Sequence, residues 1–183
     1  MKAVVRGQFE TIAFAYMNIG ATHMLELAES SDDGQLYNLI SSITFSAFTL
    51  EAYFNHLGSH LHGDWLEKER KLPKLKKYKY FCKDLKIDID FNKRPYSTIT
   101  KIFSFRDTMA HGKTTSDEIN KEIAIEIGNP TNFSVGAPWL DFSTIENAKM
   151  ILNDMQQVIK ELHSAAGFEG DPFSSSGSGL LAM

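Results

Sequence analysis

Apolar residues recur along several stretches of this 183-residue chain at alternating steps of four and three, which is the spacing of one helix face. The longest such stripe predicts a long helix that packs lengthwise against its neighbours, as in a bundle. Its members are Leu36, Ile40, Ile43, Ala47, Leu50, Phe54, Leu57 and Leu61. A second stripe, from Ile145 to Leu162, predicts a closing helix that begins near Ser143, with Glu146 three residues later as a capping box.

The first thirty residues carry a third stripe, so a helix is predicted from Ala3 to about Ser30. Its apolar face consists of Val5, Phe9, Ile12, Tyr16, Ile19 and His23. Residues 123–127 alternate between isoleucine and other residues, which predicts a strand, and residues 132–135 would return as a second one. The predicted fold class is therefore mainly α: an up-and-down helical bundle in residues 1–166, with a basic helical insertion and a small β-hairpin. A flexible Gly/Ser-rich tail is expected over residues 167–183.

Charge is distributed unevenly along the chain. The net charge of -4 gives no overall attraction to nucleic acid, but residues 67–94 hold eleven basic against five acidic residues. Pro73 divides this basic segment into two short helices. Because aromatic residues are interleaved with the lysines, one interpretation is an RNA-binding surface. It would use Lys74, Lys76, Lys77, Lys79, Tyr78 and Tyr80. The alternative is a solvated lysine-rich face whose aromatic residues belong to the core.

Several classes of site and location are disfavoured by the sequence. Cys82 is the only cysteine, so no intrachain disulfide can form and a reducing compartment is favoured. No apolar run reaches the roughly 18 residues of a membrane span, and no signal peptide is recognisable. We therefore expect a cytoplasmic protein without membrane contact. His56 and His60 lie one helical turn apart but lack further ligands of suitable spacing, so neither a metal nor a cofactor is expected.

The candidate site is the stretch Phe103–Gly112, at the end of a helix predicted from Pro95 to His111. Arg106 falls on the apolar face, where a guanidinium requires a partner. Arginine can hold phosphate oxygens, and His111 can move a proton near neutral pH. Asp107 lies one turn before His111 and is predicted to orient its imidazole and raise its pKa. Alternatively, Arg106 forms a salt bridge to Glu51 or another acid, and His111 caps the helix dipole.

The spacing of Arg106 and His111 sets a geometric requirement. Five residues of ideal helix turn the chain so that the two side chains point roughly 140° apart. They can converge on one phosphate only if the helix unwinds near Gly112 or if a second subunit completes the site.

The Arg106–Asp107 pair followed by His111 resembles the motif of HEPN-domain ribonucleases, and the stretch Ala47–Asn55 resembles the second helix of that family. The resemblance implies a homodimer with one cleft built from both motifs, metal-independent RNA cleavage and 2′,3′-cyclic phosphate products. It also suggests a toxin or antiphage-defence role with an antitoxin or regulatory protein as partner. Many such toxins carry a tyrosine two residues after the histidine, where this chain has Lys113.

Two further residues are assigned beside the predicted site. Glu51 either anchors Arg106 from the second helix, which is the favoured interpretation, or is a solvated residue beside the stripe. Asn55 on the same face would contact either RNA or a neighbouring helix. Two alternatives to the nuclease remain. One is a non-catalytic HEPN-type helical module that binds a protein, nucleotide or RNA partner. The other is an RNA-binding protein that uses only the basic segment.

Overall fold

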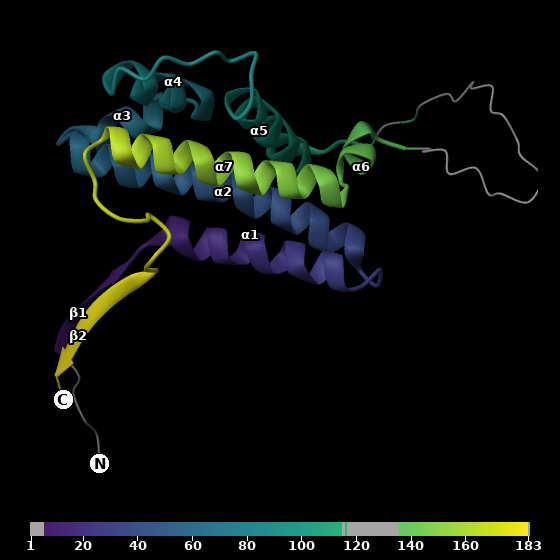
Figure 1. Cartoon of the computed structure of the whole chain (residues 1–183), viewed down its shortest axis with the longest axis horizontal. Coiled ribbons are helices and arrows are strands. Elements are labelled where there is room, and N and C mark those ends of the chain that lie inside the picture. The colour runs from purple at the N-terminus through teal and green to yellow at the C-terminus, as the bar shows by residue number, and fades with distance from the viewer. Residues whose placement is uncertain (1–5, 115, 117–135, 183) are drawn as a thin grey trace, which may run out of the picture.

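The computed structural model describes residues 6–114, 116 and 136–182, and these form a mainly helical bundle, as predicted (Figure 1). The elements in chain order are β1 Arg6–Thr11, α1 Ala13–Ser30, α2 Gln35–Leu61, α3 Trp65–Lys71, α4 Lys74–Asp84, α5 Tyr96–His111, α6 Pro138–Phe142, α7 Ile145–Ala165 and β2 Gly177–Ala182. Helices α1, α2 and α7 lie lengthwise beside one another, and α3, α4 and α5 gather on the remaining side of α2. The hairpin expected at residues 123–135 lies outside the described residues.

Helix α2 is the central element, and its predicted stripe forms much of the core. Ile43, Leu50 and Phe54 are fully buried, whereas Leu36 at the start of the helix is exposed. The short helix α3 docks on α2 where Gly58 leaves room for Trp65. A Cβ atom at Gly58 would lie only 2.1 Å from the indole ring. The lack of a side chain at Gly58 therefore lets α3 approach α2. This contact sets the position of the beginning of the basic segment against α2.

The predicted start of the first helix is wrong, and so is its predicted buried face. Residues 6–11 form a strand instead of helix, and α1 begins only at Ala13. Phe9, Tyr16 and Ile19 are 63%, 46% and 56% exposed. The side chains that α1 buries are Phe14, Ala15, Asn18, Ala21, Leu25 and Ala28.

Close approach of two backbones explains which face of α1 is buried. Ala21 and Ala28 are completely buried, and the Ser42 hydroxyl of α2 donates a hydrogen bond to the Ala21 carbonyl at 2.8 Å. Such contact between helices requires small side chains at the crossing. The larger side chains of Tyr16 and Ile19 would hold the helices apart, so α1 turns them outward.

Residues 177–182, which lie in the segment predicted as a flexible tail, form strand β2. Strands β1 and β2 pair antiparallel, with Thr11 opposite Gly177, and the ribbon extends away from the helices (Figure 1). Gly177 has a φ angle of +146°, and a Cβ atom there would lie 2.2 Å from the Glu10 carbonyl oxygen. A residue with a side chain would therefore disrupt the pairing at the base of the ribbon.

A buried carboxylate fixes the helix that carries the candidate site. Asp154 of α7 accepts two hydrogen bonds from the Arg94 guanidinium, at 2.7 and 2.8 Å, and one from the Thr98 hydroxyl at 2.5 Å. These bonds attach the beginning of α5 to α7. Helix α7 itself is capped one residue later than predicted, because the Thr144 hydroxyl accepts from the Asn147 backbone at 3.2 Å. Ser143 instead donates its hydroxyl hydrogen to the Trp139 carbonyl at 2.8 Å.

Three histidines gather where the C-terminal segment crosses the end of the bundle. The rings of His56 and His60 lie 4.2 Å apart. The ring of Phe168 packs on this cluster, 5.1 Å from His163 and 5.7 Å from His60. Burial, together with the charges of His60 and His163, lowers the pKa of His56 from its usual 6.5 to about 4, whereas Glu10 opposes the shift.

The depressed pKa of His56 predicts a loss of stability in mild acid. Between pH 6.5 and about 4 the unfolded chain binds a proton at His56 that the folded chain excludes. The stability that depends on a neutral His56 is therefore present above pH 6.5 and is lost as the pH falls through that window. Urea unfolding at pH 7 and pH 5 should show a lower midpoint at pH 5. The difference should shrink in His56→Gln and persist in His23→Gln, which changes an exposed histidine on α1. An unchanged pH dependence in His56→Gln would contradict the assignment.

Within the described ranges, no helix has both the length and the apolar character needed to cross a lipid bilayer.

Candidate functional site

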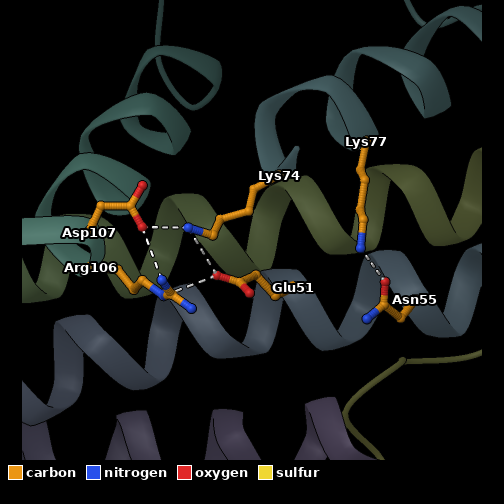
Figure 2. Close-up of polar contacts among 6 residues, drawn as sticks. All are labelled: Glu51, Asn55, Lys74, Lys77, Arg106 and Asp107. Atoms are coloured by element: carbon orange, nitrogen blue, oxygen red, sulfur yellow. Dashed lines mark hydrogen bonds and ion pairs between the residues drawn. The ribbon is translucent and has the colours of Figure 1, made fainter. Parts of the chain in front are cut away.

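Four charged side chains from three helices meet at the predicted site (Figure 2). Arg106 and Asp107 come from α5, Glu51 from α2 and Lys74 from the first turn of α4. Arg106 Nε lies 3.3 Å from Glu51 Oε1, and Arg106 Nη1 donates to Asp107 Oδ1 at 3.1 Å. Lys74 is hydrogen-bonded to Asp107, and its Nζ lies 3.9 Å from Glu51 Oε1. Two cations thus alternate with two carboxylates, and the predicted contact between Glu51 and Arg106 is confirmed.

The packing of α5 explains why Arg106 reaches Glu51. Ile99, Ile102 and Phe103 are buried against the bundle, and Arg106 lies one turn beyond Phe103 at the edge of the same face. Its side chain is 22% exposed, and the guanidinium carbon lies 5.8 Å from the centre of the Phe48 ring. The guanidinium is therefore held at the surface of the bundle, with one edge against protein and part of it open to solvent.

The pairing of Arg106 with Glu51 leaves hydrogen-bonding capacity unused. Although Nε and Oε1 lie at ion-pair distance, neither atom has a hydrogen-bond partner of good geometry, and both are buried. A buried donor or acceptor without a partner is costly, because the water that it lost has not been replaced. The cluster thus holds Arg106 in place but does not satisfy all of its hydrogen-bond donors.

Asp107 does not have the partner that the sequence predicted. It was expected to bind His111, but it accepts from Lys74 and Arg106 instead. Burial by itself would raise the pKa of Asp107, but the hydrogen bonds and charges of these two cations outweigh burial and hold that pKa below its usual range. Asp107 is therefore a carboxylate at neutral pH and positions cations, not an imidazole.

His111 is the last residue of α5, and its side chain is exposed. No hydrogen bond or ion pair within the described part of the chain involves it. Because α5 remains helical through His111, unwinding before the histidine does not bring it toward Arg106. Within one chain the two side chains therefore point in directions roughly 140° apart. Of the two arrangements that the spacing allowed, unwinding of the helix is not seen up to His111.

Asn55 contacts a neighbouring helix, which was one of its two predicted alternatives (Figure 2). Its Oδ1 accepts a hydrogen bond from Lys77 Nζ at 2.8 Å, and Glu69 Oε1 lies 3.8 Å from the same ammonium. Burial lowers the pKa of Lys77, whereas the nearby carboxylates of Glu69 and Glu51 oppose that shift. Lys77 is only 9% exposed. It therefore joins α4 to α2 and α3 and does not extend toward solvent.

The structure buries or pairs some of the six residues predicted to bind RNA and leaves others exposed. Tyr78 is 1% exposed and stacks on Phe54 in the core at 5.7 Å, so its assignment to base stacking is wrong. Tyr80 is half-buried, with its hydroxyl 3.3 Å from His62 Nε2. Lys74 and Lys77 are engaged in the contacts described above. Of the six residues, only Lys76 and Lys79 are classed as exposed.

Sequence reasoning missed a hollow on the other side of α5, which is bounded by α6. Pro138 at the start of this short helix, with Trp139 and Phe142 three residues apart on one face, is the sequence signal that could have indicated it. It was missed because a five-residue helix is too short to show a period. Cysteine, histidine and acidic side chains do not gather in groups suited to a metal ion anywhere in the described ranges.

Comparisons with protein-family models, with curated proteins and with solved structures find no match for this chain.

Proposed function

We propose that this protein is a metal-independent endoribonuclease that acts as a homodimer and carries its catalytic groups on α5. The observation that carries this proposal is the pairing of an anchored Arg106, held by Glu51 and Asp107, with an exposed His111 at the end of the same helix. An arginine fork suits phosphate oxygens, and an exposed imidazole can accept and donate a proton. Proton transfer and stabilisation of the charged phosphorus centre are the two tasks of metal-free phosphodiester cleavage, and these two groups can perform them.

The proposed reaction uses the RNA's own 2′-hydroxyl as nucleophile. His111 takes the proton from this hydroxyl while the 2′-oxygen forms a bond to phosphorus. The bond from phosphorus to the 5′-oxygen breaks, and a second imidazole returns a proton to that leaving oxygen. Arg106 stabilises the charge that develops on the non-bridging oxygens. The products are a 2′,3′-cyclic phosphate and a 5′-hydroxyl.

A homodimer meets the geometric requirement that one chain does not. Two α5 helix ends facing each other would place His111 of one subunit beside Arg106 of the other and would supply both imidazoles. Lys74 then has a defined role, because a phosphate that draws Arg106 away from Asp107 would leave that carboxylate still paired with Lys74. Asp107 would thus keep a cationic partner as the substrate binds.

The resemblance of the motif to HEPN ribonucleases extends the proposal to a biological setting. We propose a growth-inhibiting toxin or antiphage-defence effector that acts on cytoplasmic RNA and is restrained by an antitoxin or regulatory protein. The alternative is a non-catalytic HEPN-type helical module that binds a protein, nucleotide or RNA partner. One observation favours this alternative: both cations of the cluster are already paired with carboxylates in the free chain.

The decisive test is incubation of the pure protein with total RNA in the presence of EDTA, followed by end-group analysis. We expect cleavage that persists in EDTA and yields 2′,3′-cyclic phosphate and 5′-hydroxyl ends. Size-exclusion chromatography with light scattering on the same sample should give the mass of a dimer. Intact RNA after incubation with a properly folded dimer would reject the nuclease and leave the binding module.

A further inference from the structure

A hollow of about 470 Å³ lies between α5 and α6 and has two chemically different walls. One wall is aromatic and the other carries hydroxyl groups, with one lysine among the lining residues. The lining residues are Thr100, Lys101, Ser104, Phe105, Thr108, Pro138, Trp139 and Phe142. An apolar surface faced by several hydrogen-bonding groups is typical of a site for a planar polar ligand.

The aromatic wall is built before any ligand arrives. The rings of Phe105 and Phe142 lie 5.7 Å apart at an angle of 41°. Asn147 donates its side-chain amide to the Phe142 carbonyl at 3.0 Å, and Ser143 donates to the Trp139 carbonyl at 2.8 Å. The first bond attaches α6 to the first turn of α7, and the second closes the end of α6. Trp139 therefore projects from a backbone that is held in place.

The hollow adjoins the candidate site across α5. Thr100 and Ser104 also line a second hollow, of about 480 Å³, whose other residues include Lys74 and Asp107 of the charged cluster. A ridge of hydroxyl groups on α5 thus separates two hollows of similar size. Thr108, at the end of the first hollow, lies three residues before His111 and so on the same side of the helix.

We propose that the hollow between α5 and α6 binds one unpaired base of an RNA strand that crosses α5 toward His111. The base would stack on Trp139, with its polar edge toward the hydroxyls of Thr100 and Ser104 and its phosphate near Lys101. This inference rests on the proposed function, because it takes the strand to be the nuclease's substrate.

The walls favour a nucleobase over an aliphatic ligand. Stacking on an aromatic side chain needs only a π-face, which every base has, whereas an aliphatic chain entering the hollow would cover hydroxyl groups without hydrogen-bonding to them. Lys101 is exposed, so its ammonium can follow a phosphate without first breaking an ion pair among the described residues. Single-stranded RNA combines the flat apolar face, the polar edge and the negative charge that these walls accept.

Tryptophan fluorescence tests this inference directly, because the chain has only two tryptophans. Trp65 is 3% exposed, whereas Trp139 lines the hollow, so a stacked base should quench Trp139. The probe is a fluorescently labelled 2′-O-methyl oligonucleotide, which lacks the nucleophile and is not cleaved. The anisotropy of its label measures affinity in every variant, and Trp139 fluorescence reports stacking in the wild type. We expect its binding to quench the wild-type protein and to weaken roughly 10- to 100-fold in Trp139→Ala. Trp139→Phe should bind within about three-fold of wild type, because the phenyl ring still stacks, but without the quenching signal.

Two further variants separate local folding from binding. Lys101→Glu, at an exposed position, should weaken binding with no change in melting temperature. Leu66→Ala, which alters an exposed apolar residue on α3, should bind like wild type. The inference is overturned if Trp139→Ala and Lys101→Glu both bind the probe as wild type does, whether or not the protein cleaves RNA. If binding depends on both residues but RNA stays intact, the base site stands and the nuclease does not.

Discussion

Replacing His111 by alanine is expected to lower the rate of RNA cleavage by about 10²- to 10⁴-fold, the usual contribution of a general acid or base. The melting temperature should not change, because His111 is exposed and makes no hydrogen bond or ion pair with other described residues. Single-turnover cleavage of a short labelled RNA measures the first effect, and thermal unfolding followed by circular dichroism measures the second. Loss of activity without loss of stability would separate a catalytic role from a helix-capping role.

His23→Ala provides the matched control for this variant. His23 is also an exposed helix histidine, and its only described contact is a 3.8 Å approach to Glu26. Its replacement should leave cleavage unchanged. If His111→Ala cleaves RNA as fast as His23→Ala does, His111 is not the acid or base, and the observed activity must belong to another group or to a contaminant.

Replacing Arg106 by alanine is expected to lower cleavage by about 10²- to 10³-fold, as does removal of a group that stabilises the charged transition state. This variant should also lose about 1–2 kcal/mol of unfolding free energy, because Glu51 and Asp107 would lose a charged partner. Arg106→Lys should restore most of the stability but little of the activity, since an ammonium lacks the fork that grips two phosphate oxygens. Urea unfolding and the same cleavage assay measure the two quantities.

Arg94→Ala is the control that separates a broken ion pair from a lost catalyst. Arg94 makes a two-point contact with Asp154, so its loss should destabilise the chain while cleavage at a permissive temperature stays within a few-fold of wild type. If Arg106→Ala and Arg94→Ala lose activity only in proportion to stability, Arg106 is a structural residue. The non-catalytic helical module would then be the better description.

The sequence by itself determined those features that depend on local periodicity. The stripe on α2 places Ile43, Leu50 and Phe54 in the core, because residues three and four apart share a helix face whatever packs against them. Pro73 divides the basic segment into α3 and α4 because proline cannot occupy a helix interior without cost. The same periodicity predicts that Arg106 lies on a buried face, where a guanidinium needs a carboxylate partner.

Tertiary structure alone decided the features that depend on which surfaces meet. Helix α1 has apolar residues on more than one side, and the face with small residues is buried because only it lets the backbones approach. Strands β1 and β2 lie at opposite ends of the sequence, so neither strand's own pattern indicates the pairing. Asp107 turns to Lys74 because α4 brings an ammonium within reach, whereas sequence spacing measures only neighbours on one helix. The residues of Phe103–Gly112 therefore indicate which chemistry the segment could perform. The contacts between helices determine which groups its side chains bind.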